Sequence, residues 1–240
     1  MRKKKNYLLE QIISIFIKEK KGCVLDLGCG DGDYSVRLKE IGFDVKAADL
    51  DLARFKQRGK IDFQECDVTK RLPFADSSFD YVLLAEVIEH LKNPYAVMQE
   101  IGRVLKKEGK LVISTPNVLN LKSRVRYLFE GCYEFFREPL LEQSRNPKEV
   151  IFNLHVIPWR YHELEYLLED SGFSVEEIST STYEGKEWFI LVPLMWFQLN
   201  SKQKRMKKKK GLDYSRINKI LLSPEILFGR HLIITAKKEK

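Results

Sequence analysis

The sequence of 240 residues predicts an α/β fold with a doubly wound, mostly parallel sheet. Strand-like and helix-like segments alternate from residue 22 to about residue 115, and the connections between them are short. Such alternation favours parallel strands joined by right-handed helical crossovers. Three glycines also follow directly on the first apolar run, where open α/β sheets bind their ligands.

Each predicted strand is a short run rich in apolar and β-branched residues that ends at glycine, proline or a polar residue. The predicted strands are GCVLDLG (22–28), FDVKAADL (43–50), IDFQECD (61–67), SFDYVLLAEV (78–87), GKLVISTPN (109–117), FSVEEIST (173–180) and RHLIITAKK (230–238).

The predicted helices have start and stop signals of their own. A helix from about Tyr34 to Ile41 is stopped by Gly42, and Asn93-Pro94 opens a helix that runs to about Leu105. A short helix is predicted near LARFKQRG (52–59). The stretch RYHELEYLLEDSGF (160–173) has an apolar face and is predicted to end at a glycine.

The whole chain, 1–240, is predicted to form one domain, with 22–116 as its ligand-binding core. Residues 117–160 are aromatic, charged and without clear periodicity, which predicts an irregular lid over the substrate. Residues 185–229 form an insert between the last two strands, in which the apolar run WFILVPLMWF precedes the basic run KQKRMKKKK.

Composition and cysteine use narrow the class of protein. No apolar run reaches the roughly 20 residues that span a bilayer. Polar residues interrupt the apolar part of the N-terminal stretch, so residues 1–21 are predicted to form an amphipathic helix rather than a signal peptide. The four cysteines form no CxxC pair, which predicts a reduced, cytoplasmic protein without a metal site.

The net charge of +8 is unevenly distributed. Three short basic runs, at 2–5, 202–210 and the C-terminus, hold more positive charge than the net value, so the rest of the chain is mildly acidic. Such runs are either solvated surface or patches that attract anions.

The glycine loop decides which nucleotide is expected. Gly28, Gly30 and Gly32 stand at alternate positions, and Asp33 occupies the place of the third glycine in a dinucleotide fingerprint. No lysine follows to make a P-loop. Asp26 and other acidic residues are unfavourable beside a pyrophosphate but tolerable beside a cation, so the loop favours an adenosine that carries a positive group.

Two acidic residues at the ends of the next strands support an adenosine site. Asp49 ends the second strand, where a carboxylate accepts hydrogen bonds from ribose hydroxyls. Asp67 ends the third strand, within expected reach of an adenine amino group. Leu50 and Val68, the next residues along, are expected to cover the faces of the base.

Four motifs, in order, resemble the class I S-adenosylmethionine-dependent methyltransferases, in particular the type 11 and type 23 methyltransferase domains. They are VLDLGCGDG, VKAADLD, ECDVTKRLPFADSSFDYVLLAEVIEHL and EIGRVLKKEGKLVISTPN, and the resemblance covers residues 22–116. The resemblance implies S-adenosylmethionine as cofactor and a seven-stranded Rossmann-like sheet of order 3-2-1-4-5-7-6 with the seventh strand antiparallel. The positions that it implies for cofactor binding are Asp26, Gly28, Cys29, Gly30, Gly32, Asp49, Leu50, Asp67, Val68, Ala85 and Glu86.

Some residues keep two interpretations. Asp26 either contacts the amino-acid part of the cofactor or caps the loop amides. His90, after the fourth strand, and His155, in the lid, are the candidate catalytic bases for a hydroxyl acceptor, and packing is the alternative for both. Asn93-Pro94-Tyr95 is interpreted as a helix start rather than a motif that grips a target amine.

The predicted function is methyl transfer to a small molecule or a glycan, including a lipid-linked one. The segments STPNVLNLKSRVRYLFEGCYEFF and NPKEVIFNLHVIPW resemble methyltransferases encoded among polysaccharide-assembly enzymes. Tryptophans beside the basic run predict peripheral membrane contact through 188–210. The alternatives are a lid or dimer contact with a disordered lysine loop, a methyltransferase of RNA or DNA that uses the lysine runs, a non-catalytic cofactor-binding protein and, remotely, an NAD enzyme.

Overall fold

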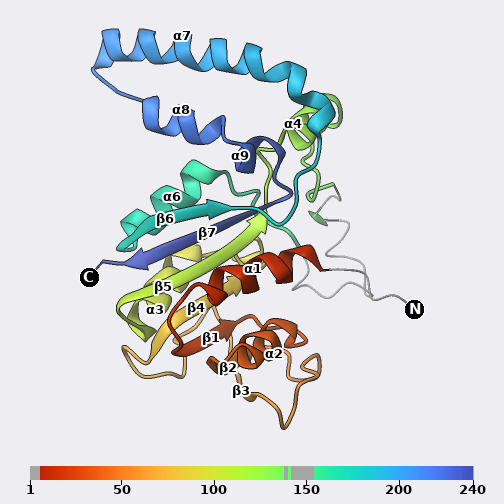
Figure 1. The fold of residues 1–240 in the computed structure, drawn as a ribbon, viewed down its shortest axis with the longest axis vertical. Coiled ribbons are helices and arrows are strands. Elements are labelled where there is room, and N and C mark those ends of the chain that lie inside the picture. The colour runs from red at the N-terminus through yellow and green to blue at the C-terminus, as the bar shows by residue number, and fades with distance from the viewer. Residues whose placement is uncertain (1–5, 138–139, 142–153, 240) are drawn as a thin grey trace.

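The computed structural model describes residues 6–137, 140–141 and 154–239. Its centre is a seven-stranded sheet of order β3-β2-β1-β4-β5-β7-β6, with helices on both faces (Figure 1). The strands pair in parallel except β7, which is antiparallel to both β5 and β6. The predicted fold class, strand order and antiparallel seventh strand are therefore confirmed.

The strands lie close to the predicted ranges, and β5 begins earlier than expected. They are β1 (Cys23–Leu27), β2 (Asp44–Asp49), β3 (Asp62–Glu65), β4 (Phe79–Ala85), β5 (Leu105–Pro116), β6 (Phe173–Ser179) and β7 (His231–Lys238). The helices of the core are α1 (Tyr7–Ile17), α2 (Asp33–Glu40), α3 (Pro94–Val104), α4 (Leu121–Glu130) and α6 (Tyr161–Asp170), with a 3-10 turn η1 (Ile88–His90) after β4.

The central strands are apolar on both faces because both faces are covered. In β4, Val82 and Leu84 join a core cluster with α3, α6 and β5, while Tyr81 and Leu83 join a second cluster with α1 and α2. Successive side chains of a strand point to opposite faces, so a continuous apolar run fits a sheet buried between two helical layers. This arrangement leaves the carboxyl edge of β1, β2 and β4 free to carry the polar loops.

The N-terminal amphipathic helix is present as α1, whose residues Ile12 and Phe16 are fully buried. The basic residues 2–5 lie outside the described residues. All four cysteines are free, and Cys29 and Cys66 are buried, as expected of thiols beside core strands.

Two predictions of local structure are wrong. Residues 52–59 form turns rather than a helix, because the Asp51 carboxylate accepts the backbone N–H groups of Ala53 and Arg54 and so competes with helical hydrogen bonds. The predicted irregular lid, 117–160, contains the helix α4, which Asn120 caps by accepting the N–H of Ser123 at 2.7 Å. Residues 138–139 and 142–153 of that lid lie outside the described residues.

The insert 185–229 is helical over most of its length. It consists of η3 (Lys186–Leu191), α7 (Val192–Lys210), α8 (Ser215–Leu221) and α9 (Pro224–Phe228), and the lysine run lies in α7 rather than in a disordered loop. Figure 1 shows α7 and α8 extending beyond the edge of the sheet that β6 forms. We call α7 and α8 the arm. Across the described ranges, no helix combines the length and apolar character that crossing a membrane requires.

Candidate cofactor site and active site

The glycine loop connects β1 to α2 at the carboxyl edge of the sheet. Gly28, Gly30 and Gly32 all have positive φ, at 77°, 55° and 84°. The backbone N–H groups of Gly28 and Cys29 donate to the carbonyl of Ala48 at 2.7 and 3.1 Å, which ties the loop to β2. A left-handed backbone at three alternate positions requires glycine, so the conformation explains the spacing seen in the sequence.

Neighbouring side chains also pack closely against the loop. A Cβ on Gly28 would lie 2.5 Å from Cγ2 of Val87, and one on Gly32 would lie 2.6 Å from the ring of Phe55. A Cβ on Gly30 would lie 3.4 Å from the guanidinium of Arg54. The loop therefore presents backbone without side chains beside the guanidinium of Arg54. The sequence analysis gave Arg54 no role.

Asp49 lies at the end of β2, directly beside the loop. Its Oδ2 accepts the N–H of Gly30 at 2.8 Å, and its Oδ1 accepts the N–H of Asp51 at 3.0 Å. Each carboxylate oxygen has a second lone pair, so two acceptors are left for a ligand's hydroxyl groups. Leu50, the next residue, is 39% exposed, and its contact with the base stays a prediction.

Asp67 lies beyond the end of β3 as an ionised carboxylate. Its Oδ1 accepts the hydroxyl and the backbone N–H of Thr69, and Lys70 lies 3.4 Å from Oδ2. The hydrogen bond from Thr69 is the main reason why the pKa of Asp67 is lowered. Val68 is partly buried and packs against the core.

Asp26 occupies a different environment, behind the loop. It is 1% exposed and accepts the hydroxyl of Ser35 at 2.5 Å. Burial raises its pKa to about 7, although the bonds from Ser35 oppose the rise. The carboxyl group is held by Ser35 of α2 rather than by the loop amides, and its contact with the cofactor stays a prediction.

Glu86 follows Ala85 at the end of β4 and has a strained backbone, with φ at 54°. Its Oε1 accepts the hydroxyl of Ser114 at 3.0 Å, and its Oε2 lies 3.8 Å from Nε2 of His231. Burial raises the pKa of Glu86. Burial also lowers the pKa of His231 to about 4, so its imidazole is neutral at pH 7.

His90 and His155, the two candidate bases, come together although 64 residues separate them in the chain. Their rings lie 4.9 Å apart between centroids. His90 Nδ1 lies 2.8 Å from the carbonyl of Leu154, and His155 Nδ1 lies 2.9 Å from that of Phe135. Burial lowers the pKa of His90. Both rings have defined hydrogen-bond partners, and a catalytic role for either stays a prediction.

Comparison with known proteins identifies the domain. A family described as methyltransferase domain matches residues 18–154, which is more than half of the chain. The chain belongs to this methyltransferase domain family. Membership of this family supports S-adenosylmethionine as the cofactor, as predicted.

Individual relatives of this methyltransferase domain cover part of the chain. A ubiquinone biosynthesis O-methyltransferase of Xanthomonas oryzae pv. oryzae is 34% identical, and the match covers 67% of this chain and 66% of that protein. One of the same name from Nitrosococcus oceani is 30% identical over 48% of this chain and 56% of that protein. The match spans only 40% to 58% of the length of the first three curated relatives.

Solved structures support the fold. A SAM-dependent methyltransferase from Archaeoglobus fulgidus superposes with a TM-score of 0.60, covering 96% of this chain and 94% of that one, at 20% identity. A putative methyltransferase from Bacillus halodurans gives the same TM-score at 17% identity. At these identities the similarity concerns the fold alone.

The residues of this methyltransferase domain fit S-adenosylmethionine on the structure's own evidence. The loop presents backbone without side chains, and Asp49 keeps two acceptors. The carboxyl group of Glu86 lies just beyond the end of β4, where a cationic ligand would favour its ionised form. The guanidinium of Arg54 lies beside Gly30 of the loop.

Sequence reasoning missed the opposite wall of this site. Tyr34 interacts electrostatically with Glu86 and Asp26, and Arg230 lies 4.9 Å from the ring of Phe135, which contacts His231. No local pattern signals these residues, because their roles arise from contacts between β4, the lid and the start of β7.

The buried carboxyl of Asp26 makes a prediction about pH. Its pKa in the folded protein, about 7, is above the ordinary value of 3.8, so the folded chain holds a proton that the unfolded chain releases between these values. We therefore expect this group to make unfolding easier as the pH rises from about 4 to about 7, by at most about 1.4 kcal/mol per pH unit, and to have no further effect above that.

Urea denaturation of the ligand-free protein and of Asp26→Asn, in steps from pH 4 to pH 8, measures this contribution. The difference between the two stability curves isolates Asp26 from other titrating groups. The stability of the wild type should fall relative to that of the variant across this range, and parallel curves would show that Asp26 is ionised throughout.

Proposed function

We propose that this protein transfers the methyl group of S-adenosylmethionine to a hydroxyl oxygen of a small molecule that carries an apolar chain. The observation that carries the proposal is the glycine loop tied to Ala48 and Asp49 at the carboxyl edge of the sheet, in a chain of the methyltransferase domain family. The O-methyltransferases of ubiquinone biosynthesis among its relatives support an oxygen acceptor.

The chain's residues have separable tasks in this reaction. Asp49 and the loop hold the nucleoside, and Glu86 with its neighbour Ser114 forms the wall beside which the acceptor is held. The cofactor supplies an activated methyl group on a sulfonium, so alignment of the acceptor oxygen with that methyl provides much of the rate. On the lid side, the guanidinium of Arg230 lies over the ring of Phe135, 4.9 Å from its centroid.

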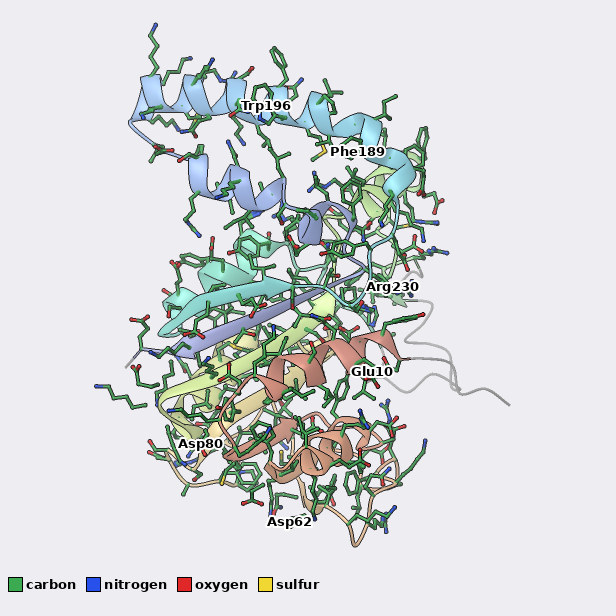
Figure 2. The ribbon with its side chains drawn as sticks, in the orientation of Figure 1. Glu10, Asp62, Asp80, Phe189, Trp196 and Arg230 are labelled. Carbon is green, nitrogen blue, oxygen red and sulfur yellow. The ribbon has the colours of Figure 1, made fainter. Side chains whose placement is uncertain are left out.

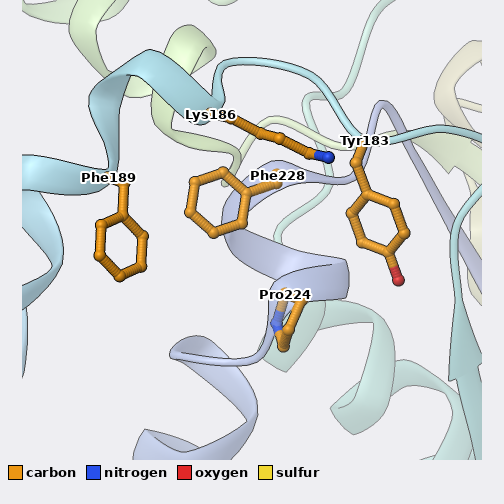
Figure 3. Close-up of a pocket in the computed structure, with 5 residues that line it drawn as sticks. All are labelled: Tyr183, Lys186, Phe189, Pro224 and Phe228. Carbon is orange, nitrogen blue, oxygen red and sulfur yellow. The ribbon is translucent and has the colours of Figure 1, made fainter.

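A pocket formed mainly by residues of the insert supports an acceptor with an apolar chain. Tyr183, Phe189, Pro224 and Phe228 line it with rings, and Lys186 stands at its rim (Figure 3). The stretch from Phe228 to His231 runs from this pocket to the contact with Glu86. A chain bound in the pocket would therefore keep its polar head within a few residues of the active-site wall.

The side chains of the insert favour contact of the protein with a membrane surface. Acceptors that carry an apolar chain would be held at such a surface. Phe189 and Trp196, labelled in Figure 2, are 62% and 58% exposed at the start of the insert. Leu194 and Phe197 share a face of α7 with Lys204 and Lys208, since these positions follow a heptad spacing. Apolar and aromatic side chains followed by lysines suit the interface of an anionic bilayer.

We expect the protein to sediment with vesicles that contain anionic lipid. Replacing Lys207–Lys210 with glutamine should weaken this binding at least tenfold, because each lysine near the surface contributes about 1 kcal/mol. A control variant with Lys18, Lys20, Lys60 and Lys107 changed to glutamine loses the same charge from the body and should bind as the wild type does. An equal loss of vesicle binding in both variants would show that the net charge of the protein, and not the arm, determines the binding.

Methyl-labelled S-adenosylmethionine, incubated with the protein and cell extract, tests the function. The extract is separated into lipid-quinone, lipid-glycan, soluble small-molecule and nucleic-acid fractions. Label in the lipid-quinone fraction is the expected result. Label in the lipid-glycan fraction would mean that the methylated hydroxyl belongs to a sugar rather than to a quinone-type ring. Label in nucleic acid would overturn the proposal, and cofactor binding without label in any fraction would indicate a non-catalytic binding protein.

A further inference from the structure

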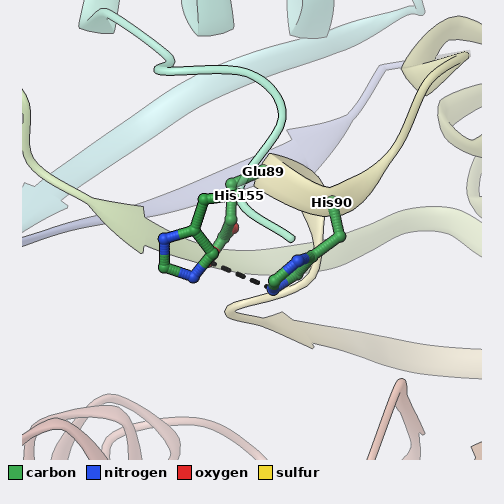
Figure 4. A group of neighbouring side chains, drawn as sticks. All are labelled: Glu89, His90 and His155. Carbon is green, nitrogen blue, oxygen red and sulfur yellow. Dashed lines mark ion pairs between the residues drawn. The ribbon is translucent and has the colours of Figure 1, made fainter. Parts of the chain in front are cut away.

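Three side chains from two distant segments converge beside the active site. Glu89 and His90 belong to η1, and His155 belongs to the lid. One potential ligand atom from each of them lies within 4.8 Å of the other two. Figure 4 shows the two imidazoles and the carboxylate gathered around a common point.

The hydrogen bonds of the two histidines determine which nitrogen of each ring is free. Nδ1 of His90 faces the carbonyl of Leu154, and Nδ1 of His155 faces the carbonyl of Phe135. A carbonyl oxygen only accepts, so Nδ1 carries the proton in both rings and Nε2 keeps an unshared lone pair. Histidines that bind metals show this arrangement, in which the second ring N–H donates to a carbonyl or carboxylate.

Glu89 is a buried carboxylate with an unused oxygen. Its side chain is 0% exposed, and Oε2 accepts the hydroxyl of Thr115 at 3.0 Å. Oε1 has no hydrogen-bond partner and lies 4.0 Å from Nε2 of His90. Among the described residues, no lysine or arginine forms an ion pair with Glu89. Burial without a neighbouring cation disfavours the charged form and raises the pKa of Glu89 well above its ordinary value.

We propose that Glu89, His90 and His155 bind a divalent transition-metal ion. Two imidazoles and one carboxylate suit zinc or iron(II) better than magnesium or calcium, which prefer sites made of oxygen. Ligand atoms around one such ion lie about 3 to 3.5 Å apart. Side-chain rotations that move the three ligand atoms by about an ångström therefore complete the site. Three protein ligands leave a position open for water or substrate.

The proposed ion gives the two histidines a role as ligands in place of their predicted role as bases. Binding of the ion does not depend on the proposed function, but its use does. An acceptor hydroxyl at the open position would lose its proton to solvent more readily. Its oxygen would then bond to the methyl carbon as the bond from that carbon to the sulfonium sulfur breaks, which leaves a neutral thioether.

Cobalt(II) provides a direct test, because its visible absorption reports coordination by the protein. We expect the chelator-treated full chain to bind one Co²⁺, zinc to displace it, and magnesium in large excess to leave it in place. His155→Ala and Glu89→Gln should each weaken Co²⁺ binding at least tenfold. His162→Ala, which removes an imidazole of α6 that lies outside the cluster, should leave the affinity unchanged.

The variants require a check that they fold. Thermal unfolding and S-adenosylmethionine binding should resemble those of the wild type, since Gln retains the acceptor for Thr115 and His155 is only partly buried. The metal site would be overturned if the wild type failed to bind Co²⁺, or if folded His155→Ala and Glu89→Gln bound Co²⁺ with the affinity of the wild type. Absorption requires no methyl acceptor, so a protein that binds Co²⁺ but labels no fraction would overturn the proposed function alone.

Discussion

Asp49→Ala is expected to weaken S-adenosylmethionine binding by about 100-fold or more. The carboxylate faces the glycine loop and keeps one acceptor on each oxygen for the ribose hydroxyls. Hydrogen bonds to a charged acceptor contribute about 1.5 to 3 kcal/mol each, and two of them account for this loss. The variant also releases the N–H of Gly30, which leaves the loop less well ordered for the ligand. Isothermal titration calorimetry measures the affinity.

Asp44→Ala is the matched control for this variant. Asp44 begins the same strand, β2, at the end remote from the loop, and its side chain is exposed. It should bind the cofactor as the wild type does. Asp49→Asn should lie between the two, because it keeps one acceptor but loses the charge. Micromolar affinity in a folded Asp49→Ala would show that the ribose assignment is wrong.

Gly28→Ala is expected to lower the free energy of unfolding by about 3 kcal/mol and to impair cofactor binding. Two costs add at this position. An L-residue at φ 77° costs about 1 to 2 kcal/mol, and the new Cβ would lie 2.5 Å from Cγ2 of Val87, which costs a further ~1 to 3 kcal/mol as overpacking. Chemical denaturation measures the loss.

Gly59→Ala separates these two costs. Gly59 has the same φ of 77°, but a Cβ there would meet no atom within 4 Å, so the variant should lose only the backbone contribution. The double variant Gly28→Ala/Val87→Ala removes the clash and should be destabilised less than the sum of its single changes. Equal losses for Gly28→Ala and Gly59→Ala would mean that the packing of the loop on Val87 carries no energy.

The strands, the glycine loop and the acidic residues at the strand ends were predictable because each depends on local chemistry. A strand buried on both faces reads as an apolar run, as in β4, and a left-handed turn reads as glycine, as at Gly28. The helix predicted at 52–59 failed because the Asp51 side chain competes for backbone N–H groups, which a periodic pattern does not reveal.

By itself, the sequence determined the fold class, the methyltransferase family and the glycine loop, since these depend on residue types at fixed spacing along a short stretch. Only the tertiary structure decided that Asp26 is buried against Ser35, that His231 approaches Glu86, and that His155 meets Glu89 and His90. These groups lie on different elements, and their protonation and their ligand chemistry depend on burial and on partners far away in the chain. Spacing encodes local geometry, whereas desolvation and long-range contact arise only when the sheet, the lid and the arm have packed together.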